Sequence, residues 1–242
     1  MRRLVDFILL LVGIVAAWQI LHWIAGDIAL TSPLDTVEHL GKLLGTERFW
    51  LNVAETARAF VAAALISLIG GVALGVALGL SRTSAIVSEP ILIALYSLPK
   101  VTLYPLVLLC FGLGISAKIA FGAMHGLIPV TIFTMKAILQ IKPVYWRTAE
   151  TMRLTPGQMA WHVALPAVIP EVLAGARLGF SLTLLGVLIG EMFASQRGLG
   201  FMITSAMGLG DIATIMAVAL FLSVFAVSAN ALLLLLDRTA AR

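Results

Sequence analysis

The stretch KPVYWRTAETMRLTPGQMAWHVALPAVIP, which runs from Lys142 to Pro170, is a long polar interruption between two hydrophobic blocks. Its apolar spacing predicts two short helices, the first over about residues 144–154. Its polar side chains include Lys142, Arg147, Glu150, Arg153, Gln158 and His162. A polar helix pair of this kind in a hydrophobic chain either lies on the membrane surface or docks a soluble partner.

The second helix of this stretch has a clear start signal. Thr155 suits the cap, Pro156 suits the first helical position, and Gln158 completes a capping box. We expect the helix to end at Pro166, because the residue before a proline, here Leu165, is disfavoured in the helical region. The loop is therefore predicted to form a helix-turn-helix.

The chain has the composition of a helical membrane protein. Of its 242 residues, 61% are hydrophobic and only 12% are charged, whereas soluble domains carry about 25% charged residues. The mean hydropathy is +1.06. A single cysteine, Cys110, excludes a disulfide framework or a cysteine-based metal site within one chain. Membrane topology explains the net charge of +4 better than nucleic-acid binding does.

Six apolar segments are long enough to cross a bilayer, which requires about 20 residues. We expect an all-α polytopic protein in which residues 1–242 form a single transmembrane domain. The expected spans are 4–24, 59–80, 91–111, 118–139, 171–193 and 212–236.

The positive charges predict the orientation of these spans, because Lys and Arg gather on the cytoplasmic side. With both termini in the cytoplasm, nine cations lie inside and five outside. The inner ones are Arg2, Arg3, Arg82, Lys136, Lys142, Arg147, Arg153, Arg238 and Arg242. The outer ones are Lys42, Arg48, Arg58, Lys118 and Arg197. The polar loop is thus expected in the cytoplasm.

The loop also resembles a known family. It closes in Leu165-Pro166 and in this looks like the EAA loop of ABC-importer permeases, especially those of the nitrate/sulfonate/taurine type. It departs from that family at two places: Arg147-Thr148-Ala149 stands where the family has Glu-Ala-Ala, and Arg153 stands where it has Gly. Further resemblances are Thr31-Ser32-Pro33, Leu98-Pro99-Lys100, Tyr104-Pro105-Leu106, Phe111-Gly112-Leu113-Gly114, Ser116-Ala117-Lys118-Ile119, Glu191-Met192 and Gly198-Leu199-Gly200. Together they cover most of the chain.

The resemblance implies a type I ABC-importer permease fold in the bacterial inner membrane, with cytoplasmic coupling helices between spans four and five. Its partners would be two cytoplasmic ATPase subunits, a periplasmic substrate-binding protein, membrane lipid, and a second permease in a homodimer or heterodimer. The solute would be small and anionic. The residues expected to couple to the ATPase are Arg147, Glu150, Arg153, Gln158, Met159, Trp161, His162, Val163 and Pro166, with Met159, Trp161, His162 and Val163 exposed for contact.

The chain lacks the motifs of an enzyme. It has no Gly-rich phosphate loop ending in Gly-Lys-Ser/Thr, no recognisable Ser/His/Asp set and no HExxH. ATP and Mg are therefore expected in a partner subunit, and no cofactor or metal in this chain. The alternatives are an ion-coupled secondary transporter, for which only Glu191 is a clear coupling carboxylate, a permease of the same family for a vitamin-precursor solute, and an intramembrane scaffold.

The third span is the candidate pathway element, because Pro99 and Pro105 should kink it and irregular backbone at membrane depth faces protein or a water-filled cavity. Lys100 near mid-depth either faces that cavity or is neutralised by Glu191 or by carbonyls freed at the kinks, and we favour neutralisation. Arg177 can snorkel to the interface instead of pairing with Glu191. The candidate pathway residues are Pro99, Lys100, Pro105 and Glu191.

Several other residues have structural interpretations. Gly71, Gly75 and Gly79 lie on one helix face, where small residues let helices approach closely, and packing within the chain is favoured over a dimer contact. The isolated His22 and His125 are expected to be packing residues. An amphipathic helix is expected after Ser32-Pro33, and residues 198–210 are expected to form a re-entrant or interfacial helix.

Overall fold

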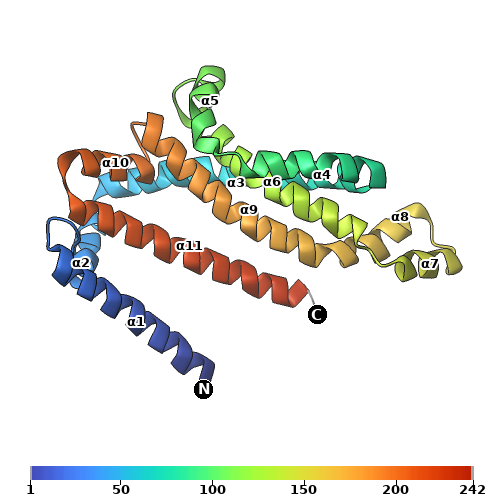
Figure 1. Ribbon diagram of the computed structural model, residues 1–242, viewed down its shortest axis with the longest axis horizontal. Helices are drawn as coiled ribbons and strands as arrows, with labels where there is room; N and C mark the ends of the chain where they lie inside the picture. Colours follow the sequence, from blue (N-terminus) through green and yellow to red (C-terminus); the bar gives the residue numbers. More distant parts are fainter. Residues whose placement is uncertain (1, 241–242) are drawn as a thin grey trace.

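The protein is a bundle of helices in the part of the chain that the structure describes. A computed structural model describes residues 2–240, without the side chains of residues 2–4, 7, 194 and 235–240. Four arginines from the charge count, Arg2, Arg3, Arg238 and Arg242, thus lie outside the described side chains. The elements are α1 Arg2–Ala25, α2 Pro33–Leu44, α3 Glu47–Gly79, α4 Arg82–Ser97, η1 Lys100–Leu103, α5 Tyr104–Phe111, α6 Ile115–Leu139, α7 Pro143–Thr151, α8 Pro156–Met159, η2 Ala160–Ala164, α9 Leu165–Ala194, α10 Leu199–Leu209 and α11 Ile212–Ala240 (Figure 1).

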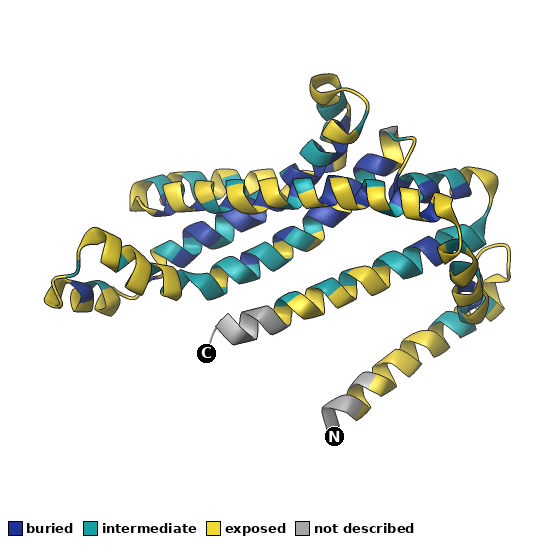
Figure 2. Cartoon of the chain, turned by 180° about the vertical axis from the view of Figure 1, so that it is seen from behind, coloured by how far each residue is buried: buried dark blue, intermediate teal, exposed yellow. Residues whose placement is uncertain are grey.

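Helices α3, α6 and α9 form the core of the bundle. Helix α4 packs along α6, and α11 packs on α2, α10 and α9. The bundle has an α10 end, where α5 also lies, and an α7 end, where α7 and α8 extend beyond the core (Figure 1). Figure 2 shows that the buried residues gather in the core helices, whereas α1 is largely exposed.

Glycines set the close approach of α3 to α6. A Cβ added to Gly71 would lie 2.7 Å from the Cβ of Val130, and one added to Gly75 would lie 2.5 Å from the Cβ of Thr134. Gly79 continues this contact one turn later. The glycine face therefore packs inside the chain, where the missing side chains allow dense contact between helices.

Among the described residues, five helices are long and apolar enough to cross a membrane, or six if one bent pair of helices counts as a span. The bent pair is 82–97 with 100–111, which turn by 86°. Leu98 is extended before Pro99, as a residue preceding proline prefers to be. The pair bends at Pro99 as expected, whereas Pro105 lies in the first turn of α5, and the pair begins at Arg82 and not near residue 91. Likewise α3 begins at Glu47, twelve residues before the expected span 59–80.

The expected helix end at Pro166 is wrong. Leu165 is helical, with φ −58° and ψ −51°, and the chain continues from α8 through η2 into α9. Element η2 is a π-helix, in which the N–H of Leu165 donates to the carbonyl of Ala160, five residues back. This wider turn accommodates the ring of Pro166 and its missing N–H in the first turn of α9.

Two shorter helices occur as expected. Helix α2 is capped by Ser32, whose hydroxyl accepts from the N–H of Asp35. Helix α10 is bounded by Gly198 and Gly210. Both helices lie at the α10 end of the bundle and pack on α11 (Figure 1).

Candidate functional site

Helix α7 ends in a conformation that normally requires glycine. Arg153 has φ +52°, the one positive φ of a non-glycine residue in the described part of the chain. Its N–H donates to the carbonyl of Glu150, and the N–H of Leu154 donates to that of Ala149. This is the Schellman pattern, whose left-handed position glycine usually occupies. Arg153 therefore holds, at a cost in strain, a backbone conformation that glycine adopts freely.

The second loop helix begins with the expected capping box. Gln158 Oε1 accepts from the N–H of Thr155 at 2.9 Å, and Thr155 Oγ1 accepts from the N–H of Gln158 at 3.4 Å. His162 Nδ1 lies 3.1 Å from the carbonyl of Gln158. The start of α8 is therefore fixed locally, without support from the core.

The two loop helices enclose a groove of about 510 Å³, which we call the loop groove. It is lined by Val144, Tyr145, Thr148, His162, Val163, Pro166 and Ala167. Trp161 precedes the lining residue His162 in the sequence and is 71% exposed. The large apolar exposure of Trp161 on a polar loop fits a surface that a partner covers.

The residues expected to couple lie on this surface to different degrees. Arg147, Glu150, Arg153, Gln158, Trp161, His162 and Pro166 are exposed. Met159 and Val163 are half-buried, so the expectation that they are exposed is wrong. Met159 is the last residue of α8, and Val163 lies in η2 and lines the loop groove.

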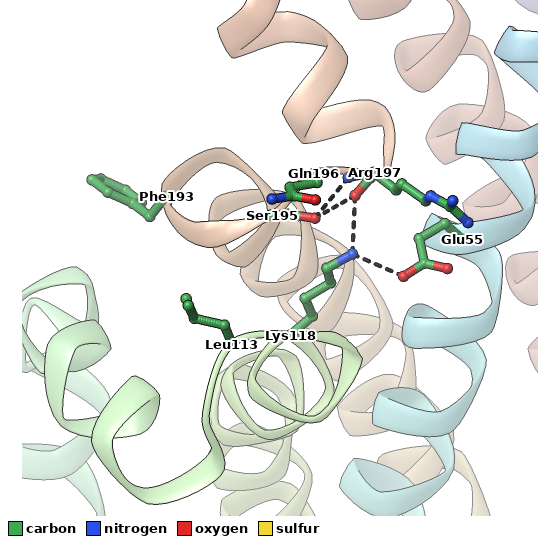
Figure 3. Close-up of a pocket in the computed structure, with 8 residues that line it drawn as sticks. Glu55, Leu113, Lys118, Phe193, Ser195, Gln196 and Arg197 are labelled. Atoms are coloured by element: carbon green, nitrogen blue, oxygen red, sulfur yellow. Dashed lines mark hydrogen bonds and ion pairs between the residues drawn. The ribbon is translucent and has the colours of Figure 1, made fainter.

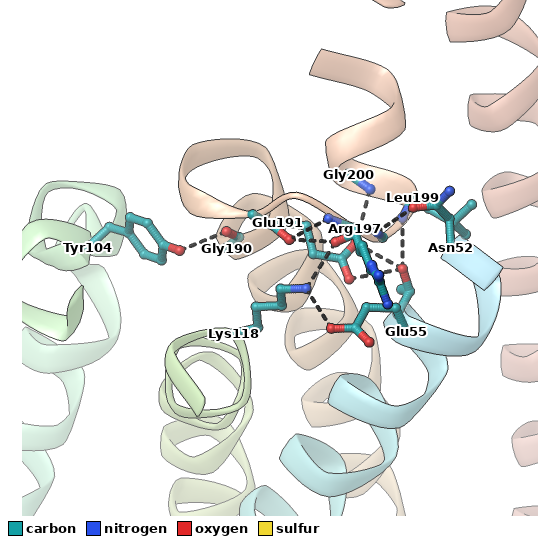
Figure 4. Close-up of polar contacts among 12 residues, drawn as sticks. Asn52, Glu55, Tyr104, Lys118, Gly190, Glu191, Arg197, Leu199 and Gly200 are labelled. Carbon is teal, nitrogen blue, oxygen red and sulfur yellow. Dashed lines mark hydrogen bonds and ion pairs between the residues drawn. The ribbon is translucent and has the colours of Figure 1, made fainter. Parts of the chain in front are cut away.

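At the α10 end, the carboxylate of Glu191 joins three helices. Glu191 on α9 is fully buried, and its two oxygens accept from Thr56 Oγ1 on α3 at 3.0 and 2.9 Å. Its Oε2 also accepts from the N–H of Gly200 on α10 at 3.0 Å (Figure 4). A carboxylate at a helix N-terminus is favoured by the unpaired N–H groups there. Glu191 therefore fixes the start of α10 against the core.

The turn before α10 depends on the same side chains. Thr56 Oγ1 accepts from the N–H of Leu199 at 2.8 Å, and Asn52 Oδ1 accepts from the N–H of Gly198 at 2.7 Å. Gly198 has φ +118°, and a Cβ there would lie 2.2 Å from the carboxyl carbon of Glu191. Glycine is required at this position by both its backbone conformation and the space available.

A second buried charge crosses the same end of the bundle. Lys118 on α6 donates to Glu55 Oε1 on α3 at 3.0 Å and to the carbonyl of Arg197 at 2.9 Å (Figure 4). The hydroxyl of Tyr104 on α5 donates to the carbonyl of Gly190 on α9 at 2.7 Å. These bonds connect α3, α5, α6, α9 and the turn before α10.

A pocket of about 640 Å³ opens beside these bonds, and we call it the α10-end pocket (Figure 3). Its lining combines charged and polar groups with two apolar side chains. The lining residues are Glu55, Leu113, Gly114, Lys118, Phe193, Ser195, Gln196 and Arg197. Its volume lies within the range of small-molecule sites, about 300–1,000 Å³.

Lys100 is neutralised by a backbone carbonyl and not by Glu191. Its Nζ donates to the carbonyl of Tyr96 at 2.9 Å and lies 5.2 Å from the centre of the Tyr96 ring. The side chain is buried at the break between α4 and η1, next to Pro99. Pro105 lies in the first turn of α5. The structure thus brings Lys100, Pro99 and Pro105 together at the bend, and Glu191 belongs to another cluster.

The isolated histidines have local partners. His125 Nδ1 lies 2.8 Å from the carbonyl of Phe121, and His22 Nδ1 lies 2.7 Å from that of Leu30. Both interactions agree with the expected packing role. Among the described residues, no group of three or more His, Cys, Asp or Glu side chains could hold a metal ion.

A third polar contact attaches α2 to the first turn of α11. His39 Nε2 lies 3.0 Å from Thr214 Oγ1, which donates to Asp211 Oδ2 at 2.6 Å. The N–H of Thr214 donates to Asp211 Oδ1 at 3.0 Å, so Asp211 caps α11. The hydrogen bonds from the side chain and backbone of Thr214 lower the pKa of the Asp211 carboxyl.

The sequence analysis missed most of the cluster at the α10 end. Asn52, Glu55 and Thr56 precede the expected span 59–80 and were not among the candidate site residues. Lys118 and Arg197 entered the charge count, and Lys118 also the resemblance, but neither was predicted as a site residue. A signal was present, because Asn52 and Thr56 are four residues apart and lie on one helix face directly before an apolar run. Buried polar residues at the end of a span need partners, which marks them as site candidates.

Comparison with known proteins places the chain among transport proteins. The family profile described as "Binding-protein-dependent transport system inner membrane component" matches residues 71–242. The taurine transport system permease protein of Escherichia coli (strain K12) is 28% identical over 206 residues, which are 81% of this chain and 75% of that protein. The nitrate import permease protein of Leptolyngbya laminosa is 25% identical over 241 residues, 96% of this chain and 85% of that protein.

A relative named for a different solute is also similar. The riboflavin transport system permease protein of Chloroflexus aurantiacus (strain ATCC 29366 / DSM 635 / J-10-fl) is 31% identical over 153 residues. The match covers 63% of this chain and 57% of that protein. These relatives share a role in transport, and their names differ in the solute.

Proposed function

The chain belongs to the family of binding-protein-dependent transport system inner membrane components, and from this premise we propose that it is the permease subunit of an ATP-driven importer. Residues 1–242 form its single transmembrane domain. Two cytoplasmic ATPase subunits hydrolyse ATP with Mg, and a periplasmic binding protein delivers the solute. The permease pairs with a second copy or a homologue to enclose the pathway.

The observation that carries this proposal is the loop formed by α7, α8 and η2. Helix α7 ends in a Schellman motif and α8 begins with a capping box, the loop extends beyond the core at the α7 end, and Trp161 is exposed. A locally stabilised loop with an exposed aromatic residue fits a docking element. In the proposed orientation the α7 end faces the cytoplasm, where the ATPase subunits meet it. The α10 end then faces the periplasm.

Transport follows from alternating access. ATP brings the ATPase subunits together, and the loop moves with them. The continuous helix from α8 through η2 into α9 carries this motion to the α10 end as a rigid element. Glu191 bonds the α10 end of α9 to Thr56 on α3, and Lys118 on α6 donates to the carbonyl of Arg197 in the turn after α9. We place the pathway along the bent element 82–111, with Pro99, Lys100 and Pro105 at its bend and Glu191 at the end of a neighbouring span.

The proposed solute is a small anion. Two of the compared relatives are named for taurine, which carries a sulfonate, and for nitrate. The riboflavin permease supports the alternative of a vitamin-type solute. A ligand screen on the binding protein that supplies this permease separates these two solute classes.

The docking proposal is tested by replacing Trp161 with Ala in the complex. We expect loss of ATPase co-purification or of coupling between ATP hydrolysis and transport, because Trp161 is the most exposed of the large apolar side chains described on the loop. Trp23 on α1 is equally exposed at 74%, so Trp23→Ala is the matched control. Normal assembly and coupled transport in Trp161→Ala, combined with the same result for Met159→Asp with Val163→Asp, would refute docking at this loop.

The orientation is tested separately. A reporter that is active only in the cytoplasm should be active when inserted after Lys142 and silent after Arg48. The reverse pattern would overturn both the orientation and the docking surface.

A further inference from the structure

The α10-end pocket gathers more positive than negative charge. Lys118 and Arg197 contribute two cations to its lining, and Glu55 contributes one carboxylate (Figure 3). The nearby carboxylate of Glu191 is not part of the lining, because its oxygens are bonded to Thr56 and to the start of α10. The side chains that line the pocket therefore carry one more positive than negative charge.

The two cations have unused hydrogen-bond donors. Lys118 has three N–H donors, of which one bonds Glu55 and another the carbonyl of Arg197. The guanidinium of Arg197 is exposed and makes no ion pair in the part of the chain that the structure describes. A planar guanidinium matches the paired oxygens of a sulfonate, nitrate or carboxylate. The donors needed to hold an oxoanion are thus present on one side of the pocket.

Glu55 provides an internal competitor for such an anion. Its Oε1 lies 3.0 Å from Lys118 Nζ, and the carboxylate is only partly buried. An incoming oxoanion can replace Glu55 as the hydrogen-bond acceptor of the Lys118 ammonium while the Glu55 carboxylate turns toward solvent. Exchange of this kind keeps affinity low, which a transport site requires because a bound solute must also leave.

We propose that the α10-end pocket is a low-affinity binding site for a small oxoanion, held by Arg197 and Lys118, with Glu55 as the competing carboxylate. This inference rests on the proposed function, which turns the pocket toward the side from which solute arrives. It assigns anion recognition to Lys118 and Arg197, and leaves Lys100 a structural role at the bend.

The test uses protection of a single thiol at the pocket wall. Gln196 lines the pocket and is exposed, so Gln196→Cys in a Cys110→Ser background reports its occupancy. The full permease, co-expressed with its ATPase subunits and reconstituted in nanodiscs, is labelled with an uncharged thiol reagent, which makes the rate insensitive to bulk electrostatics. Millimolar ethanesulfonate or nitrate should slow labelling severalfold relative to chloride at the same ionic strength.

Variants then separate site binding from general charge effects. Arg197→Gln should abolish protection, and Glu55→Gln should lower the anion concentration that gives half protection. Arg58→Gln removes an exposed cation on the same helix as Glu55 but outside the pocket, so it should leave protection unchanged. Lys118 is buried and Lys118→Met risks misfolding, so Arg197→Gln is the deciding variant.

Three outcomes would overturn the site: no protection by either anion, protection that survives Arg197→Gln, or protection that appears only with the binding protein and not with free anion. ATPase co-purification and ATP-dependent uptake are measured on the same preparation. A complex that imports solute without anion protection would reject the pocket and keep the proposed function. Protection in a chain that never assembles with an ATPase would reject the proposed function and keep the anion site.

Discussion

Replacing Glu191 tests how the start of α10 is held. Glu191→Ala removes the acceptor of the Gly200 N–H, which is then buried without a partner, and it removes the acceptor of the Thr56 hydroxyl. An unsatisfied buried donor costs about 1–3 kcal/mol, and the cavity adds to this, so we expect a loss of about 2–4 kcal/mol in total. For a chain of this size the melting temperature should fall by about 4–16 °C.

Glu191→Gln should be much milder. The amide oxygen can accept from the N–H of Gly200, and the amide nitrogen can donate to Thr56 Oγ1, so both contacts keep a partner. The expected loss is about 1 kcal/mol. Glu38→Ala, which removes an exposed carboxylate paired with Lys42 on α2, should change stability by less than about 1 kcal/mol.

The assay is thermal unfolding followed by the fluorescence of the five tryptophans in one detergent, together with hydrogen exchange over residues 198–203. Glu191→Ala should lower the melting temperature and speed exchange at the start of α10, whereas Glu191→Gln should do neither to a comparable degree. Equal behaviour of Ala and Gln, or a wild-type melting temperature for Ala, would refute the assignment of Glu191 as the group that fixes α10.

Three further changes test other parts of the structure. Gly75→Ala should destabilise the protein by about 1–3 kcal/mol, because its Cβ would lie 2.5 Å from that of Thr134, whereas Gly41→Ala meets nothing within 4 Å and should not lower the melting temperature. Arg153→Gly should raise stability by about 1 kcal/mol by relieving the left-handed conformation; slower amide exchange in α7 would show it, and faster exchange would contradict it. The Asp211 carboxylate stabilises the fold above the ordinary carboxyl pKa of about 3.9, and this contribution is lost as pH falls through the lowered pKa of the folded state. In Asp211→Asn the free energy of unfolding should therefore fall less steeply as the pH is lowered through the acid range. The same decrease as in the unchanged protein would count against this cap.

Local signals in the sequence predicted local structure well. Ser32 and Thr155 cap α2 and α8 as expected, because capping depends on residues within one turn. Pro99 breaks the third span because it removes an N–H and restricts the residue before it. The wrong prediction of a helix end at Pro166 also concerns local structure. A π-turn, which no single-residue preference encodes, accommodates this proline inside a continuous helix.

The candidate site at the α10 end was less predictable, because it depends on packing. Glu191 finds its partner Thr56 at a separation of 135 residues, and Lys118 finds Glu55 at a separation of 63. Charge and hydropathy placed these side chains near one membrane surface, but they could not predict which of them bond to one another. The expectation that Lys100 could use a freed carbonyl succeeded because that carbonyl, on Tyr96, lies only four residues away.

The measurement that tests the central claim most directly is solute uptake into proteoliposomes that contain this permease, its ATPase subunits and its binding protein. Uptake should require ATP on the side of the membrane where the ATPase subunits bind. It should stop in Trp161→Ala, because the ATPase then no longer docks on the loop. An ion gradient alone should drive no uptake, because Glu191, the one clear coupling carboxylate in the sequence, is bonded to Thr56 and Gly200. Gradient-driven uptake by the permease without ATP would contradict the account and identify a secondary transporter.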